Sequence, residues 1–158
     1  MSPEGSSITF RRVPDELRRP VERFASRLQI EVTKGRPFDC VITSDAELRR
    51  LNREFRGEDH ATDVLSFPAG LLPDGVPSGL GSVTKPLGDL AISLPRARSQ
   101  AREFGHGIEQ EIQILMLHGV LHLLGMDHET DRGSMARAEK RWRARLGLPN
   151  SLIERVQS

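Results

Sequence analysis

The sequence predicts a single α+β domain in which about four strands form a mixed sheet packed against four or five helices. The length of 158 residues fits one domain. Short strand-like runs alternate with helical patterns along the chain, and no internal repeat interrupts them. With 37% hydrophobic residues at this length, the chain can form a core without covalent staples. The lone Cys40 excludes an internal disulfide bond and any zinc site built from several cysteines of this chain.

The N-terminal elements are expected to be an edge strand and an amphipathic helix. Residues 1–7 are expected to be disordered, and the strand to run from Ile8 to Val13. The helix follows because apolar residues recur at helical spacing, and Pro20 within it marks the start of the regular helix or a kink. The apolar positions of this helix are Leu17, Val21, Phe24 and Leu28.

The next two strands are predicted on either side of a helix. Phe38–Thr43 is rich in strand-forming residues, and Thr62–Pro68 is a similar run that its proline ends. Between them, Ser44 and Glu47 have the spacing of a capping box, which opens a helix. The apolar face of that helix carries Leu48, Leu51 and Phe55.

A long loop is predicted before the fourth strand. Gly70–Pro86 contains four glycines and three prolines, and loops of this length in compact domains tend to be functional or disordered. The strand Leu87–Ser93 follows, and Ser93 is expected to cap a helix that reaches about Phe104.

Two more helices complete the predicted domain. The first is almost continuously apolar from about Ile108 to Leu124 and ends at Gly125, which can adopt the left-handed conformation. The last helix ends at Gly147, and one stripe of it carries Met135, Ala138, Trp142 and Leu146.

The net charge of +1 points to no particular partner, but the distribution of charge is uneven. Between Arg132 and Arg145 there are six basic residues and one acidic residue. This basic segment is either a nucleic-acid contact or an ordinary solvated face.

The start of the chain lacks the basic and apolar pattern of a secretory signal. Apolar runs also stay short of the roughly 20 residues that a membrane helix needs. We therefore expect a cytoplasmic protein with no membrane partner.

Three histidines predict a metal site at the end of the apolar helix. His118 and His122 are four residues apart and project from the same helical face. After Gly125 turns the chain back, His128 can return to the same point. Three imidazoles with an open fourth position are the pattern of a catalytic zinc site, whereas structural zinc sites are closed by four protein ligands.

This histidine spacing matches that of the metzincin proteases with one departure, which is Gly119 in place of their catalytic glutamate. Without that general base, peptide hydrolysis loses the group that takes the proton of the attacking water. A glycine within a helix is also unfavourable by about 1 kcal/mol relative to alanine, so either a close helix contact or the substrate itself is expected to need the space. The substitution therefore counts against a protease.

Three segments in the same order resemble one known family. The stretch HGVLHLLGMDH, residues 118–128, resembles the signature of the YbeY endoribonuclease family of bacterial ribosomal RNA maturation factors. Asn52–Arg56 followed by Thr62–Pro68 resembles a second block of that family, and Leu87–Ser93 a third. The resemblance covers the chain from about Ala46 to the end of the last helix.

The resemblance implies a zinc-dependent, single-strand-specific endoribonuclease that acts in ribosomal RNA processing, at the 3′ end of 16S RNA, and in ribosome quality control. It implies that His118, His122 and His128 bind one Zn²⁺ and that Arg56 is the functionally important arginine near the metal. The partners it implies are single-stranded or ribosomal RNA and ribosomal or small-subunit proteins, with no DNA expected.

Some residues keep two interpretations. Asp63 and Asp89 could each orient a ligand histidine or hold the local backbone, whereas Asp127 is better explained as a turn residue. Arg56 could bind phosphate or form a structural ion pair with Asp59 or Asp63.

Three function classes follow from the sequence. The favoured class is a metal-dependent endoribonuclease. The alternatives are a zinc hydrolase of peptide or acyl substrates, and a ribosome assembly factor without catalytic activity in which the metal is structural.

Overall fold

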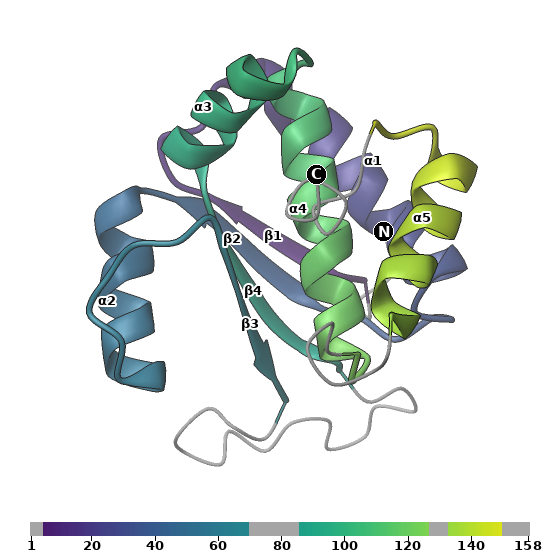
Figure 1. The fold of residues 1–158 in the computed structure, drawn as a ribbon, viewed down its shortest axis with the longest axis horizontal. Coiled ribbons are helices and arrows are strands. Elements are labelled where there is room, and N and C mark those ends of the chain that lie inside the picture. The colour runs from purple at the N-terminus through teal and green to yellow at the C-terminus, as the bar shows by residue number, and fades with distance from the viewer. Residues whose placement is uncertain (1–4, 70–85, 127–132, 150–158) are drawn as a thin grey trace.

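The computed structural model describes residues 5–69, 86–126 and 133–149, and within these ranges it is an α+β domain. One four-stranded sheet has the strand order β1-β2-β4-β3 (Figure 1). Its strands are β1 (Ser7–Phe10), β2 (Asp39–Thr43), β3 (Val64–Pro68) and β4 (Gly88–Ser93). The helices are α1 (Asp15–Glu31), α2 (Asp45–Arg56), α3 (Leu94–Phe104), α4 (Ile108–Leu123) and α5 (Ser134–Leu146). The predicted fold class is thereby confirmed.

The sheet is mixed, as predicted. β1, β2 and β4 are parallel neighbours, and β3 is the edge strand that pairs antiparallel with β4. The carboxyl ends of the three parallel strands therefore lie at one end of the sheet. At the other end β3 finishes and β4 begins, with Pro68 opposite Gly88 in the register.

Helices cover both faces of the sheet, and the alternation of side chains along each strand divides the core accordingly. On one face, α1 and α4 pack together over Cys40, Ile42, Leu90 and Ile92, and α5 contacts α4. On the other face, α2 packs over a smaller cluster that contains Leu48, Leu65, Phe67 and Ala91. None of the described helices combines the length and hydropathy needed to cross a membrane.

The N-terminal region departs from the sequence prediction at two points. Ser7 starts β1, and Ser6 donates hydrogen bonds to Gln29 at 2.7 Å, so residues 5–7 are ordered rather than disordered. Helix α1 begins at Asp15 and continues through Pro20. The missing N–H of Pro20 removes one helical hydrogen bond, but the buried residues on both sides of it hold the helix against the core. The predicted loop at 70–86 lies outside the described residues except for Pro86.

The predicted helix ends are largely confirmed. Ser44 accepts a hydrogen bond from the Glu47 N–H at 3.2 Å, and Ser93 accepts one from Arg96 at 3.3 Å. Glu47 does not complete the capping box, because its carboxylate binds Arg50 instead. Gly125 has φ +94°, the left-handed conformation expected at the end of α4.

Gly119 allows α4 to lie very close to the sheet. A Cβ atom at this position would stand 2.6 Å from Cδ2 of Leu90, and Leu90 is itself buried. Beside it, the Ser66 hydroxyl of β3 donates a hydrogen bond to the Gly119 carbonyl at 3.2 Å. Of the two reasons for a glycine here, the close helix contact is confirmed.

Gly119→Ala is expected to destabilise the protein by about 1 kcal/mol. Overpacking a core typically costs ~1–3 kcal/mol, and the better helix propensity of alanine returns about 1 kcal/mol of this. Urea unfolding of the wild type and the variant measures the difference. Leu90→Val is the matched background, since it removes the methyl groups that the added Cβ atom would meet. An equal loss of stability in both backgrounds would contradict the contact.

Candidate metal centre

Two of the three predicted metal ligands meet on α4. The Nε2 atoms of His118 and His122 are 3.2 Å apart, and their rings meet edge to face with centroids 4.7 Å apart. Their spacing of four residues places them one turn apart on the same side of the helix. His118 is only 8% exposed and His122 is half-buried, so the pair lies at the boundary between core and solvent.

A carboxylate that the sequence analysis missed holds the first of these histidines. Nδ1 of His118 lies 3.0 Å from Oε1 of Glu139 on α5, and Glu139 is completely buried. With Glu139 ionised, its carboxylate only accepts hydrogen bonds, and the ring proton of a neutral His118 is then on Nδ1. The lone pair of His118 is then on Nε2, the atom that faces His122.

This geometry fits a metal ligand pair. Two nitrogens at about 2.0–2.1 Å from a tetrahedral Zn²⁺ lie about 3.3 Å apart, close to the 3.2 Å found here. Ligand histidines commonly donate their other N–H to a carboxylate, as His118 does to Glu139. His128, the third predicted ligand, is outside the described residues, as is Asp127. Within the described part of the chain, no group of three or more His, Cys, Asp or Glu residues could hold a metal.

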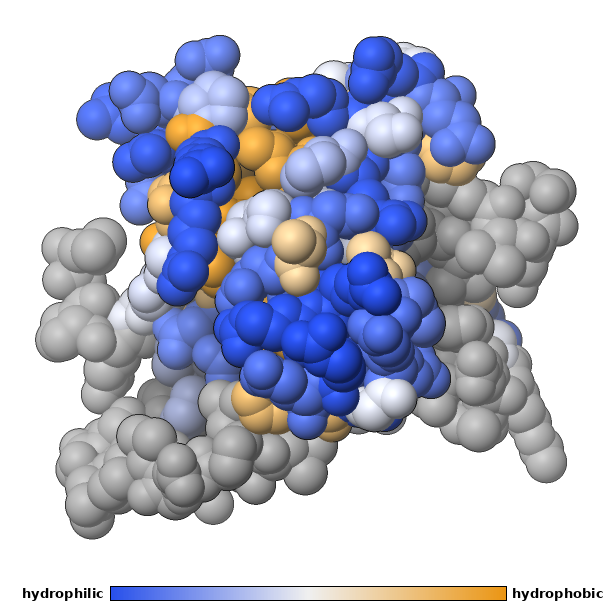
Figure 2. All heavy atoms as spheres, turned by 90° about the vertical axis from the view of Figure 1, so that its left-hand side faces the viewer, coloured by the Kyte–Doolittle hydropathy of each residue, from blue (hydrophilic) through white to orange (hydrophobic). Residues whose placement is uncertain are grey.

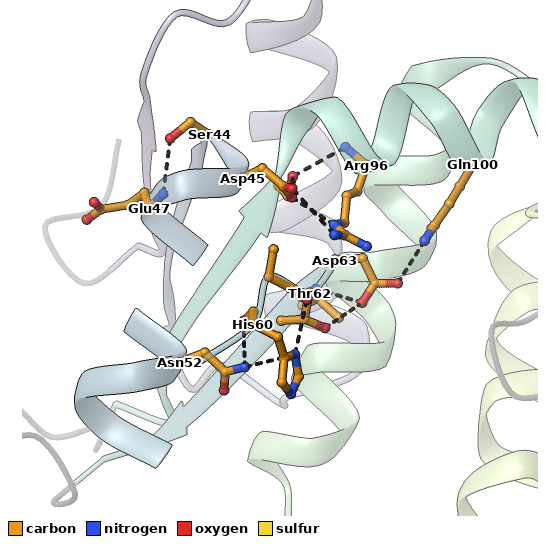
Figure 3. A network of polar contacts seen from close by, with 12 residues as sticks. Ser44, Asp45, Glu47, Asn52, His60, Thr62, Asp63, Arg96 and Gln100 are labelled. Atoms are coloured by element: carbon orange, nitrogen blue, oxygen red, sulfur yellow. Dashed lines mark hydrogen bonds and ion pairs between the residues drawn. The ribbon is translucent and has the colours of Figure 1, made fainter. Parts of the chain in front are cut away.

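Among the described residues, the Asp63 carboxylate contacts the local backbone and Gln100 rather than a histidine. Its carboxylate accepts hydrogen bonds from the Val64 N–H at 2.8 Å and from Gln100 Nε2 at 3.1 Å (Figure 3). The Asp63 carbonyl also accepts from the Ser93 N–H at 2.9 Å, where β4 ends. These contacts join the start of β3 to α3 and favour the backbone interpretation.

Asp89 lies on the other side of β4 from the histidines. Its neighbour Leu90 faces Gly119 of α4, and successive side chains of a strand point to opposite faces. Asp89 instead stands beside Asp39 in the strand register. Burial, together with the neighbouring charge of Asp39, raises the pKa of the Asp89 carboxyl. The raised pKa favours the folded state at low pH, and this stabilisation is lost as the pH rises through it.

Arg56 is the last residue of α2, and its side chain is exposed. Asp59 is bound by Arg49 at 2.8 and 3.2 Å, and Asp63 by Gln100, so neither acid predicted for a structural pair contacts Arg56. Among the described residues, Arg56 forms no ion pair. Figure 1 shows the carboxyl ends of α2 and α4 at the same end of the sheet, where β3 finishes. Figure 2 views the side on which α2 lies, and hydrophilic residues cover most of it, apart from an apolar hollow near the top.

The fold and the histidine pair define a small α+β domain in which two imidazoles meet on the largely buried helix α4. The model of the endoribonuclease YbeY family matches residues 6–147. The chain belongs to this family.

Named relatives agree with this assignment, and one solved structure has a similar fold. An endoribonuclease YbeY of Solibacter usitatus is 72% identical over 158 residues, which covers 99% of each chain. One of Koribacter versatilis is 51% identical over 116 residues, covering 73% of this chain and 68% of the relative. The solution structure of a Thermotoga maritima protein has a TM-score of 0.57 at 25% identity, covering 87% of this chain and 85% of that chain.

Glu139→Gln is expected to weaken zinc binding by about 10–100-fold, the typical effect of changing a carboxylate behind a ligand histidine. Competition with a chromophoric chelator measures the affinity. Glu103→Gln on α3 makes the same change of charge at an exposed position and should bind zinc as the wild type does. The ¹⁵N shifts of the His118 ring in metal-free protein should report a proton on Nδ1. Equal affinities in both variants would contradict the role of Glu139.

Proposed function

We propose that the protein is a zinc-dependent endoribonuclease that cleaves single-stranded RNA during ribosomal RNA maturation. Its proposed work includes processing of the 3′ end of 16S RNA and ribosome quality control, which implies a cytoplasmic location and small-subunit proteins as partners. The observation that carries the proposal is the pair of Nε2 atoms, 3.2 Å apart, in a chain of the YbeY family. The buried Glu139 holds the His118 ring of this pair.

The proposed ligands of one Zn²⁺ per chain are His118, His122 and His128. When bound, the ion would polarise a phosphoryl oxygen and neutralise charge that develops during cleavage. The protein contributes the orientation of the ligands. Glu139 fixes the His118 ring, and the close packing of α4 at Gly119 fixes the helix that carries the first two histidines.

Arg56 is proposed to bind a phosphate oxygen of the RNA. It is exposed, it has no ion pair within the described residues, and it ends the helix that lies across β3 from α4. A guanidinium group binds two oxygens of a phosphate through its planar fork, which suits the stabilisation of charge in a transition state.

The contact at Gly119 argues against the alternative of a peptide hydrolase. A glutamate there would have to enter the space beside Leu90 and the Ser66 hydroxyl, because even a Cβ atom is too close to Leu90. A glutamate at this position would therefore require Leu90 to shift. We expect Gly119→Glu to yield no protease activity.

Cleavage of labelled ribosomal RNA tests the proposal against both alternatives. The wild type should cleave RNA, should leave unfolded casein intact, and should lose RNA cleavage when a chelator removes the metal. His122→Ala should release most of the zinc, because two imidazoles make a poor zinc site. His60→Ala is the control, since His60 is exposed on the segment after α2.

Each other outcome of this experiment contradicts the proposal. Casein cleavage would identify a peptide hydrolase. Unfolding on chelation without any cleavage would identify a structural metal in an assembly factor. One equivalent of zinc retained by His122→Ala would show that the ligand assignment is wrong.

Arg56→Ala and Arg56→Lys are both expected to keep their zinc and their melting temperature but to lose RNA cleavage by about 10²-fold or more, as when a charge-stabilising donor is removed. Lysine should rescue poorly, because a point charge cannot reproduce the fork of arginine. Single-turnover cleavage and thermal unfolding measure the two properties. Arg23→Ala on α1 is the exposed control. Full cleavage by folded, zinc-loaded Arg56→Ala would overturn the role.

A further inference from the structure

We propose that a second pocket, far from the histidine pair, binds phosphate groups of the RNA backbone. The inference rests on the proposed function for the identity of the polymer. The pocket has a volume of about 380 Å³. It is lined by Arg11, Arg12, Thr43, Ser44, Glu47, Leu94, Pro95 and Arg98, and we call it the arginine pocket.

The carboxyl ends of the parallel strands build this pocket. Arg11 and Arg12 directly follow β1, Thr43 ends β2, and Leu94 follows β4. The Arg11 N–H donates to the Ile42 carbonyl at 3.0 Å, which fixes the segment after β1 to β2. In open α/β sheets, the crevice at this edge of the strands is where ligands usually bind.

The charge of the arginine pocket is positive and uncompensated. Arg12 and Arg98 are exposed, and within the described residues their guanidinium groups have no ion-pair or hydrogen-bond partner. Glu47 is the only acid in the lining, and Arg50 binds its carboxylate. Arg50, with a smaller contribution from Arg11, holds the pKa of Glu47 below its ordinary value. Glu47 therefore has Arg50 as its hydrogen-bond partner, and Arg12 and Arg98 remain for a ligand, with Arg11 beside them.

The two helices that start at the arginine pocket add to its preference for anions. Helices α2 and α3 follow β2 and β4 and begin with Ser44 and Ser93 as N-caps, so the positive ends of their dipoles face this edge. Free N–H groups in the first turn of a helix also bind phosphate oxygens. The wall formed by Leu94 and Pro95 is apolar, which suits a sugar better than a second anion.

The arginine pocket is separate from the candidate metal centre. Gly119 lies against Leu90, which is three residues before the end of β4, a distance of about 10 Å along a strand. His122 lies nearly one helical turn beyond Gly119, and α4 runs away from the carboxyl edge of the sheet (Figure 1). A ligand that reaches both places has to be extended and to carry repeated phosphates. Single-stranded RNA has both properties, and the planar fork of arginine suits its phosphates.

Binding of a fluorescent single-stranded oligoribonucleotide, followed by anisotropy in metal-free protein, tests this proposal. The variant is Arg11→Gln/Arg12→Gln/Arg98→Gln. The control is Arg19→Gln/Arg23→Gln/Arg102→Gln, which removes the same charge from exposed positions of α1 and α3 outside the pocket lining. The pocket variant should bind at least about tenfold more weakly than the control. Its slope of log K against log salt should be shallower by about 2, since each phosphate contact to a single strand contributes about 0.7.

Amide NMR gives a direct measurement at the site. Titration of the oligonucleotide should shift the Thr43 and Ser44 amides in the wild type and not in the pocket variant. Equal binding by the two triple variants, whether both strong or both weak, would overturn the proposal. Binding only of an acidic protein, with no effect on RNA, would overturn it as well.

The measurement separates this proposal from the proposed function. It uses no metal and no cleavage. If His122→Ala cleaved RNA normally while the pocket variant lost binding, the metal assignment would fail and the arginine pocket would stand. If RNA were cleaved with metal but the pocket variant bound it normally, only the pocket would fail.

Discussion

The close approach of α4 to the sheet at Gly119 is the constraint on which the rest of the site depends. A side chain at this position would press against the buried Leu90, so that Leu90 or the helix would have to shift. The histidines on either side of Gly119 belong to the same helix, so their distance from β3 and β4 is set by this contact. The hydrogen bond from Ser66 to the Gly119 carbonyl fixes the same point from the edge strand. One glycine thus explains both the packing of the helix and the absence of a metzincin-type base.

The hydrogen bond between His118 and Glu139 extends this constraint to the last helix. Burying an ionised carboxylate without partners is unfavourable, and one of its oxygens is satisfied by the His118 ring. The other oxygen, Oε2, has no hydrogen-bond partner within the described residues. Glu139 therefore ties α5 to the histidine-bearing end of α4 at a cost in desolvation. This buried contact between Glu139 and His118 lies next to the His122 imidazole. Its position is better explained by a function than by a contribution to stability.

The sequence could predict much of the fold because its local signals agreed with one another. All nine described elements could be located from three signals. These are the serine N-caps, the prolines and glycines that end elements, and the apolar periodicity. The regular helix does not begin at Pro20, because core packing on both sides of this residue outweighs one lost hydrogen bond. Among the site residues, the meeting of His118 and His122 followed from their spacing alone. The orienting carboxylate was sought in Asp63 and Asp89, since they stand in the segments that resemble the family. The sequence does contain a signal for Glu139. This residue is the only acid in the basic segment 132–145, and it lies four residues after the buried Met135, on the same face of the helix.

Sequence patterns could not locate the arginine pocket, because its members are brought together by the sheet and not by spacing. More than thirty residues separate Arg11 from Thr43, and more again separate Thr43 from Arg98. Only the parallel order of β1, β2 and β4 brings these residues to one edge of the sheet. The same order sends α4 away from that edge, so the histidines arrive at the opposite end of the domain. A parallel sheet with one antiparallel edge strand thus has two chemically distinct ends. One presents helix N-termini and arginines, and the other presents the imidazoles of α4 and the carboxyl end of α2 on opposite faces of the sheet. An extended polyanion is the kind of substrate that can use both ends at once.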